Sequence, residues 1–181
     1  MKRSIHVSFL ATVLLATGAA NASAQSDPLR AGAQRTYGIV KGYITRAAEK
    51  MPEEHYAFKP TKEVRSFGQL VGHIADASFG FCSAVAGEKP PMGGFDSPIE
   101  KGTTTKAALQ KALAAGFAYC DKVYASASDS TATVMVKGFW GELPKLSVLD
   151  FNTAHDFEHY GNIVTYMRLK DIVPPSSEPR K

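Results

Sequence analysis

The chain has 181 residues, enough for one domain with its own core, and its 21 Lys+Arg against 17 Asp+Glu give a formal net charge of +4. No stretch interleaves basic and aromatic residues as a nucleic-acid surface does, so the composition argues against a nucleic-acid partner. The net charge falls from +4 to +2 when the two positive charges of Lys2 and Arg3 are removed with the N-terminal segment described next.

Residues 1–24 have the pattern of a secretory signal peptide. Lys2 and Arg3 give a positively charged start, the short apolar run VSFLATVLLATGAA follows, and the sequence ASA at 22–24 is a cleavage signal of small residues. The apolar run is too short for a convincing membrane anchor. We therefore expect residues 25–181 to form a single exported domain, periplasmic or secreted, without a membrane anchor.

Apolar residues recur at three- and four-residue spacing in four segments of the mature chain, which predicts four helices. The first covers about 27–51, and Ser26 is placed to cap its N-terminus. The second begins at Ser66, where the hydroxyl of Ser66 and the side chain of Gln69 can form a capping box, and it stops at Gly87.

The third helix is expected over about 104–126. The fourth is expected to open at Ser147, with Asp150 completing a second capping box, and to end near Asp171, just before a Pro-Pro pair.

The connections between these helices are long. Residues 88–103 are rich in glycine and proline and predict a crossover, while 131–146 alternate weakly and could form a small hairpin around Lys137-Gly138. Four helices with one or two long connections are typical of an all-α four-helix bundle.

Three histidines are candidates for a metal site. His155 and His159 lie four residues apart in the fourth helix, so their side chains are about 40° apart on one face and can converge on one ion. His73, from the second helix, would complete a three-histidine site with open coordination positions, whereas His55 lies in a loop. The glutamate of the zinc-protease motif is absent, and an ordinary hydrogen-bonded pair of histidines remains the alternative.

Four further residues have helical positions near these histidines. Asp76 and Glu158 lie about 60° to one side of a histidine and could accept its second imidazole N–H. Asn162 and Tyr166 lie within roughly 20° of His155 and could orient a ligand or a substrate. Surface carboxylates and a polar seam in the bundle are the alternative interpretations.

Two motifs, RSFGQLVGHIADA and HDFEHYGNIVTYMRLKDIVPPSS, resemble the DinB family, also called the DinB/YfiT-like superfamily, and the likeness covers about residues 27–177. The resemblance implies a four-helix bundle of up-down-down-up topology, frequent homodimers, and a divalent metal ion held by His73, His155 and His159. One departure is Asp171, where the family commonly has glycine.

The resemblance leaves the activity open. Some relatives are metal-dependent transferases or isomerases that use a low-molecular-weight thiol, and export argues against such cytosolic thiols. A three-histidine zinc or nickel site could activate a water or thiol, so a metal-dependent hydrolase or transferase acting on a small molecule is one hypothesis. A non-catalytic metal-binding or stress-related protein is the other.

Cys82 and Cys120 are the only cysteines. Cys82 is turned about 180° from His73 on its helix, so it does not resemble a metal ligand. In the topology that the resemblance implies, the second and third helices run parallel. Each cysteine lies 16 residues into its helix, counted from Ser66 and Thr104, which predicts a disulfide. Two buried free thiols are the alternative.

Overall fold

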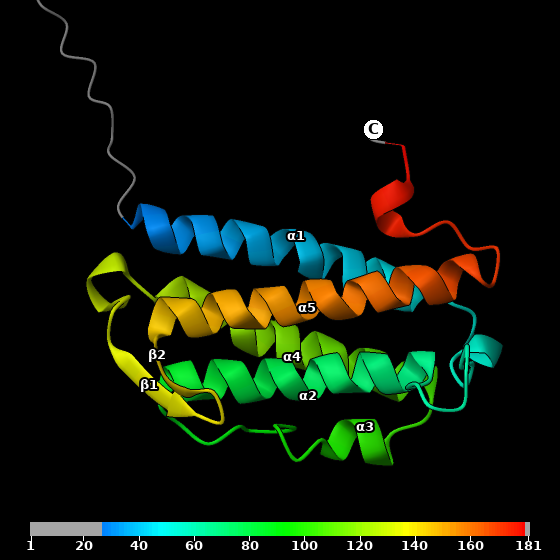
Figure 1. Ribbon diagram of the computed structural model, residues 1–181, viewed down its shortest axis with the longest axis horizontal. Coiled ribbons are helices and arrows are strands. Elements are labelled where there is room, and N and C mark those ends of the chain that lie inside the picture. The colour runs from blue at the N-terminus through cyan, green and yellow to red at the C-terminus, as the bar shows by residue number, and fades with distance from the viewer. Residues whose placement is uncertain (1–26, 180–181) are drawn as a thin grey trace, which may run out of the picture.

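The computed structural model describes residues 27–179, which form four long helices packed side by side, one short helix and a small hairpin (Figure 1). The long helices are α1 (Pro28–Lys50), α2 (Phe67–Ala86), α4 (Lys106–Ser126) and α5 (Lys145–Arg168). The short helix α3 (Pro98–Gly102) lies between α2 and α4, and the strands β1 (Met135–Gly138) and β2 (Gly141–Pro144) precede α5. The expected signal peptide, residues 1–24, and the expected cap Ser26 lie outside the described residues.

The mostly helical fold confirms the expected class, with two differences. The crossover contains α3, and residues 131–146 contain an antiparallel pair of strands, so residues 27–179 are not purely helical. The hairpin turns at Phe139-Trp140, because Lys137 pairs with Glu142 and Gly138 with Gly141, and not around Lys137-Gly138 as expected. Gly141 has a φ of 87°, a left-handed conformation that glycine adopts without strain.

The expected ends of α2 are confirmed. Ser66 Oγ accepts the N–H of Gln69 at 3.1 Å, and Gln69 Oε1 accepts the N–H of Ser66 at 2.8 Å, which completes the capping box. Gly87 ends the helix with a φ of 77°.

The expected Ser147 cap of the last helix is wrong. Helix α5 begins two residues earlier, at Lys145, directly after β2. The backbone N–H of Lys145 donates to Val134 O and that of Leu146 donates to Ala132 O. Backbone carbonyl groups from the segment before β1 therefore satisfy two N–H donors at the helix start, where no side chain caps α5.

Helices α2 and α4 run in the same direction. Gly72, near the start of α2, lies against Leu109, near the start of α4, and the later residues Cys82 and Cys120 also meet. Gly116 allows the helices to approach, because a Cβ at this position would lie 3.1 Å from the carbonyl oxygen of Ala75. The bundle core includes the stacked rings of Tyr37 and Tyr124, whose centroids are 4.3 Å apart.

Helix α2 packs against both α4 and α5, and α1 packs against the same two helices (Figure 1). Within residues 27–179, none of the helices combines the length and the apolar character needed to cross a membrane.

Candidate metal centre

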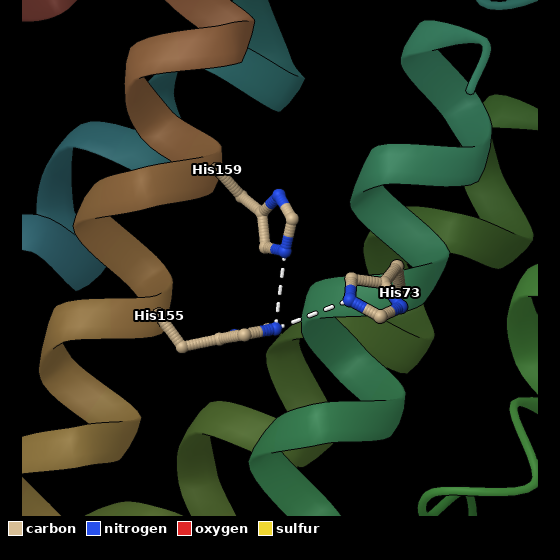
Figure 2. Close-up of side chains that lie close together, drawn as sticks. All are labelled: His73, His155 and His159. Carbon is tan, nitrogen blue, oxygen red and sulfur yellow. Dashed lines mark hydrogen bonds between the residues drawn. The ribbon is translucent and has the colours of Figure 1, made fainter. Parts of the chain in front are cut away.

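Three imidazole rings meet between α2 and α5 (Figure 2). His73 Nε2 lies 3.1 Å from His155 Nε2, and His159 Nε2 lies 3.0 Å from the same atom. The ligand atoms of the three side chains all lie within 4.8 Å of one another. The four-residue spacing in α5 and the packing of α2 against α5 thus bring together the three residues that the sequence predicted as ligands.

The donor set fits a divalent metal ion. A nitrogen such as His155 Nε2 can make one hydrogen bond in the ring plane, as donor or as acceptor, yet it has two imidazole nitrogens beside it. An ion bound at about 2.0–2.1 Å from each nitrogen holds neighbouring ligand nitrogens roughly 2.9–3.4 Å apart. Hydrogen bonding among the three rings alone does not explain why the nitrogens lie so close together. The same distances are those expected when the nitrogens share a bound metal ion, so the three residues could hold a metal.

The surroundings keep all three imidazoles neutral at pH 7. Burial, followed by the charges of the neighbouring histidines and of Arg65, lowers the pKa of His155 to about 3. Burial, His73 and Arg65 lower the pKa of His159 to about 4. The pKa of His73 is also lowered, chiefly by burial and by Arg65. Neutral imidazole is the form that binds metal, so the site needs no deprotonation before loading.

Glu100, which the sequence analysis did not single out, contacts one of the candidate ligands. Its Oε2 lies 3.0 Å from His73 Nδ1, and its Oε1 accepts from Arg65 Nε at 2.8 Å. A carboxylate in this position keeps the proton on Nδ1 and leaves His73 Nε2 free for the ion. Glu100 lies in α3, within a crossover without helical periodicity, so no sequence signal marked it.

Asp76 was expected to accept an imidazole N–H, but its carboxylate does not contact an imidazole nitrogen. Its carboxylate accepts the backbone N–H of Ile99 at 3.2 Å and that of Glu100 at 2.8 Å. Asp76 therefore anchors α3 to α2, and Glu100 takes the position beside His73 that was expected for Asp76.

The other predicted neighbours surround a pocket next to His159. Asn162 Nδ2 lies 3.4 Å from His159 Nδ1, and Tyr166 donates its hydroxyl proton to the carbonyl oxygen of Arg65 at 2.6 Å. Glu158 is exposed and lines the outer part of the pocket. The pocket has a volume of about 650 Å³, enough for a small molecule. It is lined by Pro60, Glu63, Val64, Arg65, Leu70, Glu100, Glu158, His159, Asn162, Thr165 and Tyr166.

Aromatic rings cover the other side of the cluster. The ring of Phe81 lies 5.6 Å from that of His155, centroid to centroid. Gly80 leaves room for the ring of Phe95 beside α2, because a Cβ at Gly80 would lie 2.7 Å from that ring. Phe81 also contacts rings from the crossover, the hairpin turn and the start of α5, which are Phe95, Phe139, Trp140 and Phe151.

Two buried polar groups of neighbouring residues in α5 have no hydrogen-bond partner within residues 27–179. One is His155 Nδ1, and the other is the fully buried carboxyl group of Asp156. Burial raises the pKa of Asp156 well above its usual range, so this group is held in the uncharged form.

The two cysteines lie away from the histidine cluster. A disulfide joins Cys82 of α2 to Cys120 of α4, with a Cα–Cα distance of 5.4 Å. His55, in the single-turn helix Glu53–His55, is not part of the cluster.

The fold and the cluster define a class of helical-bundle protein with a three-histidine site between two helices. The DinB superfamily matches the chain over residues 41–163, and the chain belongs to this superfamily. The resemblance of the two helix motifs is thereby confirmed. None of the curated proteins compared with the chain matches it.

Solved structures share the fold. A DinB-like protein from Bacillus cereus has a TM-score of 0.67 and 15% identity, covering 80% of this chain and 95% of its own. A DinB-like protein from Bacillus subtilis has a TM-score of 0.65 and 18% identity, covering 83% of this chain and 99% of its own. A mycothiol-dependent maleylpyruvate isomerase has a TM-score of 0.63 and 16% identity, covering 74% of this chain. The match spans only 60% of the isomerase.

Proposed function

We propose that the protein is an exported metal-dependent enzyme, a hydrolase or a transferase, whose His73, His155 and His159 hold a divalent zinc or nickel ion. The observation that carries this proposal is the approach of two Nε2 atoms to His155 Nε2 at 3.0 and 3.1 Å beside a pocket of about 650 Å³. When bound, such an ion lowers the pKa of a coordinated water or thiol and so supplies a nucleophile at neutral pH.

The alternative is a non-catalytic metal-binding or stress-related protein. The enzyme is favoured because three protein ligands leave coordination positions open, whereas purely structural zinc sites are closed by four. The adjacent pocket gives a small-molecule substrate access to those positions, since His159 is part of its wall.

The choice between transferase and hydrolase depends on where the protein acts. The isomerase of similar fold is named as mycothiol-dependent, which supports thiol chemistry. Export would separate this chain from cytosolic thiols, and this supports the hydrolase.

The signal-like residues 1–24 and the disulfide between Cys82 and Cys120 support a periplasmic or secreted location. Fractionation of expressing cells followed by N-terminal sequencing tests the location, and a protein found in the cytosol with Met1 retained would contradict export.

The topology and the assembly are part of the proposal. The parallel contacts of α2 with α4 support an up-down-down-up bundle with a long crossover. A homodimer is proposed on the family resemblance. Light scattering coupled to size-exclusion chromatography measures the molar mass in solution and tests this proposal.

The test of the function is metal content followed by activity. The purified wild type is expected to hold about one divalent ion per chain, and His73→Ala, His155→Ala and His159→Ala should each lose most of it, because each removes one of three ligands. His55→Ala is the matched control and should keep the ion. A triple variant that still holds one ion per chain would show that the site is elsewhere. Hydrolase and transferase substrates are then screened with the metal-free and the reloaded protein, and activity absent from both favours the non-catalytic alternative.

A further inference from the structure

Arg65 holds a permanent positive charge at the wall of the pocket. It lies in the loop before α2, and its Nε donates to Glu100 Oε1 at 2.8 Å. Its backbone carbonyl accepts the hydroxyl proton of Tyr166 at 2.6 Å, which ties this loop to α5. The guanidinium group is positively charged and carries only hydrogen-bond donors. Arg65 is thus a fixed cation in a pocket that also contains His159.

The terminal nitrogens of this guanidinium group are free to bind a ligand. Within residues 27–179, the bond from Nε to Glu100 is the only hydrogen bond that the Arg65 side chain makes. The side chain is 41% exposed, so the two terminal nitrogens can be reached from the pocket. A guanidinium group with both terminal nitrogens free can bind a planar carboxylate through two parallel N–H···O bonds.

The inner end of the pocket favours an anion. Arg65 is linked to the histidine cluster through one carboxylate, because Glu100 accepts from Arg65 Nε at 2.8 Å through Oε1 and lies 3.0 Å from His73 Nδ1 through Oε2. Of the three carboxylates that line the pocket, Glu100 is the one that is already paired with Arg65 and His73. Asp76 does not line the pocket; it lies behind Glu100 and accepts its backbone N–H at 2.8 Å.

The other two carboxylates that line the pocket are exposed to solvent. Glu63 is 64% exposed and lies 3.6 Å from Lys62 Nζ, and Glu158 is exposed on α5. A divalent ion at the histidines would add two positive charges to that of Arg65. The inner end would then carry three positive charges, against the carboxyl groups of Glu100 and, behind it, Asp76.

We propose that the site takes a small carboxylate substrate, with one carboxylate bound by the terminal nitrogens of Arg65 while the rest of the molecule extends to the ion held by the histidines. This inference rests on the proposed function, because the ion contributes to the binding. It adds the chemical class of the substrate and the residue that selects it. The pocket volume of about 650 Å³ limits the substrate to a small molecule.

The experiment uses the full-length mature protein loaded with Co²⁺, whose visible spectrum changes when a ligand enters the coordination sphere. Succinate is titrated as the probe, and succinamide serves as its uncharged counterpart. The wild type is expected to bind succinate at least tenfold more tightly than succinamide. Arg65→Gln should weaken succinate binding at least tenfold, because it removes the charge and the paired donors, and Arg65→Lys should lie between the two.

Lys62→Gln is the matched control. Lys62 lies three residues from Arg65 on the same loop, its side chain is 92% exposed, and it does not line the pocket, so succinate binding should be unchanged. Cobalt content and melting temperature of every variant are measured first. Equal succinate affinities of wild type and Arg65→Gln, both loaded with cobalt, would overturn the inference, as would no binding of succinate by the loaded wild type. A wild type that takes up no cobalt instead defeats the proposed function.

Discussion

Asp76 and Glu100 are 24 residues apart in the chain, and the backbone N–H of Glu100 donates to Asp76 Oδ2 at 2.8 Å. This bond holds the short helix α3 against α2 at the level of His73. The Glu100 carboxylate consequently reaches His73 Nδ1 at 3.0 Å. Asp76 thus supports the candidate metal ligand His73 indirectly, because it holds the carboxylate of Glu100 in place.

Glu100→Ala should weaken divalent metal binding by about 10- to 100-fold, because the His73 ring loses the acceptor that fixes its orientation and its tautomer. Asp76→Ala should weaken it in the same direction by releasing α3, although Asp76 makes no bond to an imidazole nitrogen. Competition with a chromophoric chelator measures both affinities. Glu142→Gln, on the exposed strand β2, is the control and should bind metal as the wild type does. An unchanged affinity in Glu100→Ala would show that the carboxylate does not support the site.

Acid should destabilise the metal-free protein through His155 and His159. Their folded pKa values of about 3 and about 4 lie below the ordinary 6.5, so the unfolded chain binds more protons between these limits. Their contribution to the free energy of unfolding is therefore complete above pH 6.5 and falls as the pH is lowered toward about 4. Asp156 acts in the opposite direction, because burial raises the pKa of its carboxyl group.

A comparison of variants separates these contributions. Urea unfolding of the metal-free wild type and of the His155→Gln/His159→Gln double variant is measured between pH 7 and pH 4. The double variant should lose less stability on acidification, since it lacks the two imidazoles that protonate on unfolding. Parallel curves for the two proteins would contradict the prediction.

Removing the disulfide should cost stability and spare the metal site. The Cys82→Ala/Cys120→Ala variant should lose about 2–4 kcal/mol of unfolding free energy, as expected for a bridge between residues 38 apart in sequence. Metal content should be unchanged, because neither sulfur belongs to the histidine cluster. Urea unfolding and elemental analysis measure the two effects. Mass spectrometry of non-reduced peptides from periplasmically produced protein checks the bond itself, and free thiols at both positions would refute it.

Asp171→Gly should stabilise the protein by about 0.5 kcal/mol. Asp171 has a φ of 57°, which costs an L-residue about 1 kcal/mol, and glycine recovers this at the expense of greater freedom in the unfolded chain. Gly87→Ala makes the reverse change after α2, where φ is 77° and an added Cβ would meet no atom within 4 Å. It should therefore destabilise through the backbone alone, by about 1 kcal/mol. Thermal unfolding of both variants decides the signs, and a destabilised Asp171→Gly would refute the strain argument.

Much of the fold could be read from local sequence patterns. The capping box of Ser66 and Gln69 and the stop at Gly87 depend on residues next to each other in the chain, so the ends of α2 were predicted correctly. The start of α5 was not, because the helix begins at Lys145, where backbone carbonyl groups of Ala132 and Val134 accept its first N–H groups, and not at the Ser147 cap that the local sequence suggested. A contact between two segments that are far apart in the chain cannot be recognised from the sequence of either segment alone.

In the candidate site, too, some features follow from local sequence and others from contacts between separate elements. Sequence by itself determined the helical periodicity, the four-residue spacing that turns His155 and His159 to one face, and the choice of His73 as their partner. The tertiary structure alone decided that Glu100 and not Asp76 contacts His73 and that Arg65 lines the pocket. It also decided that Phe81 contacts His155 and four further aromatic rings. These contacts join residues from a crossover, a loop and a hairpin turn. Such segments have no period that fixes the direction of a side chain, so only the packing of the helices determines where their side chains lie.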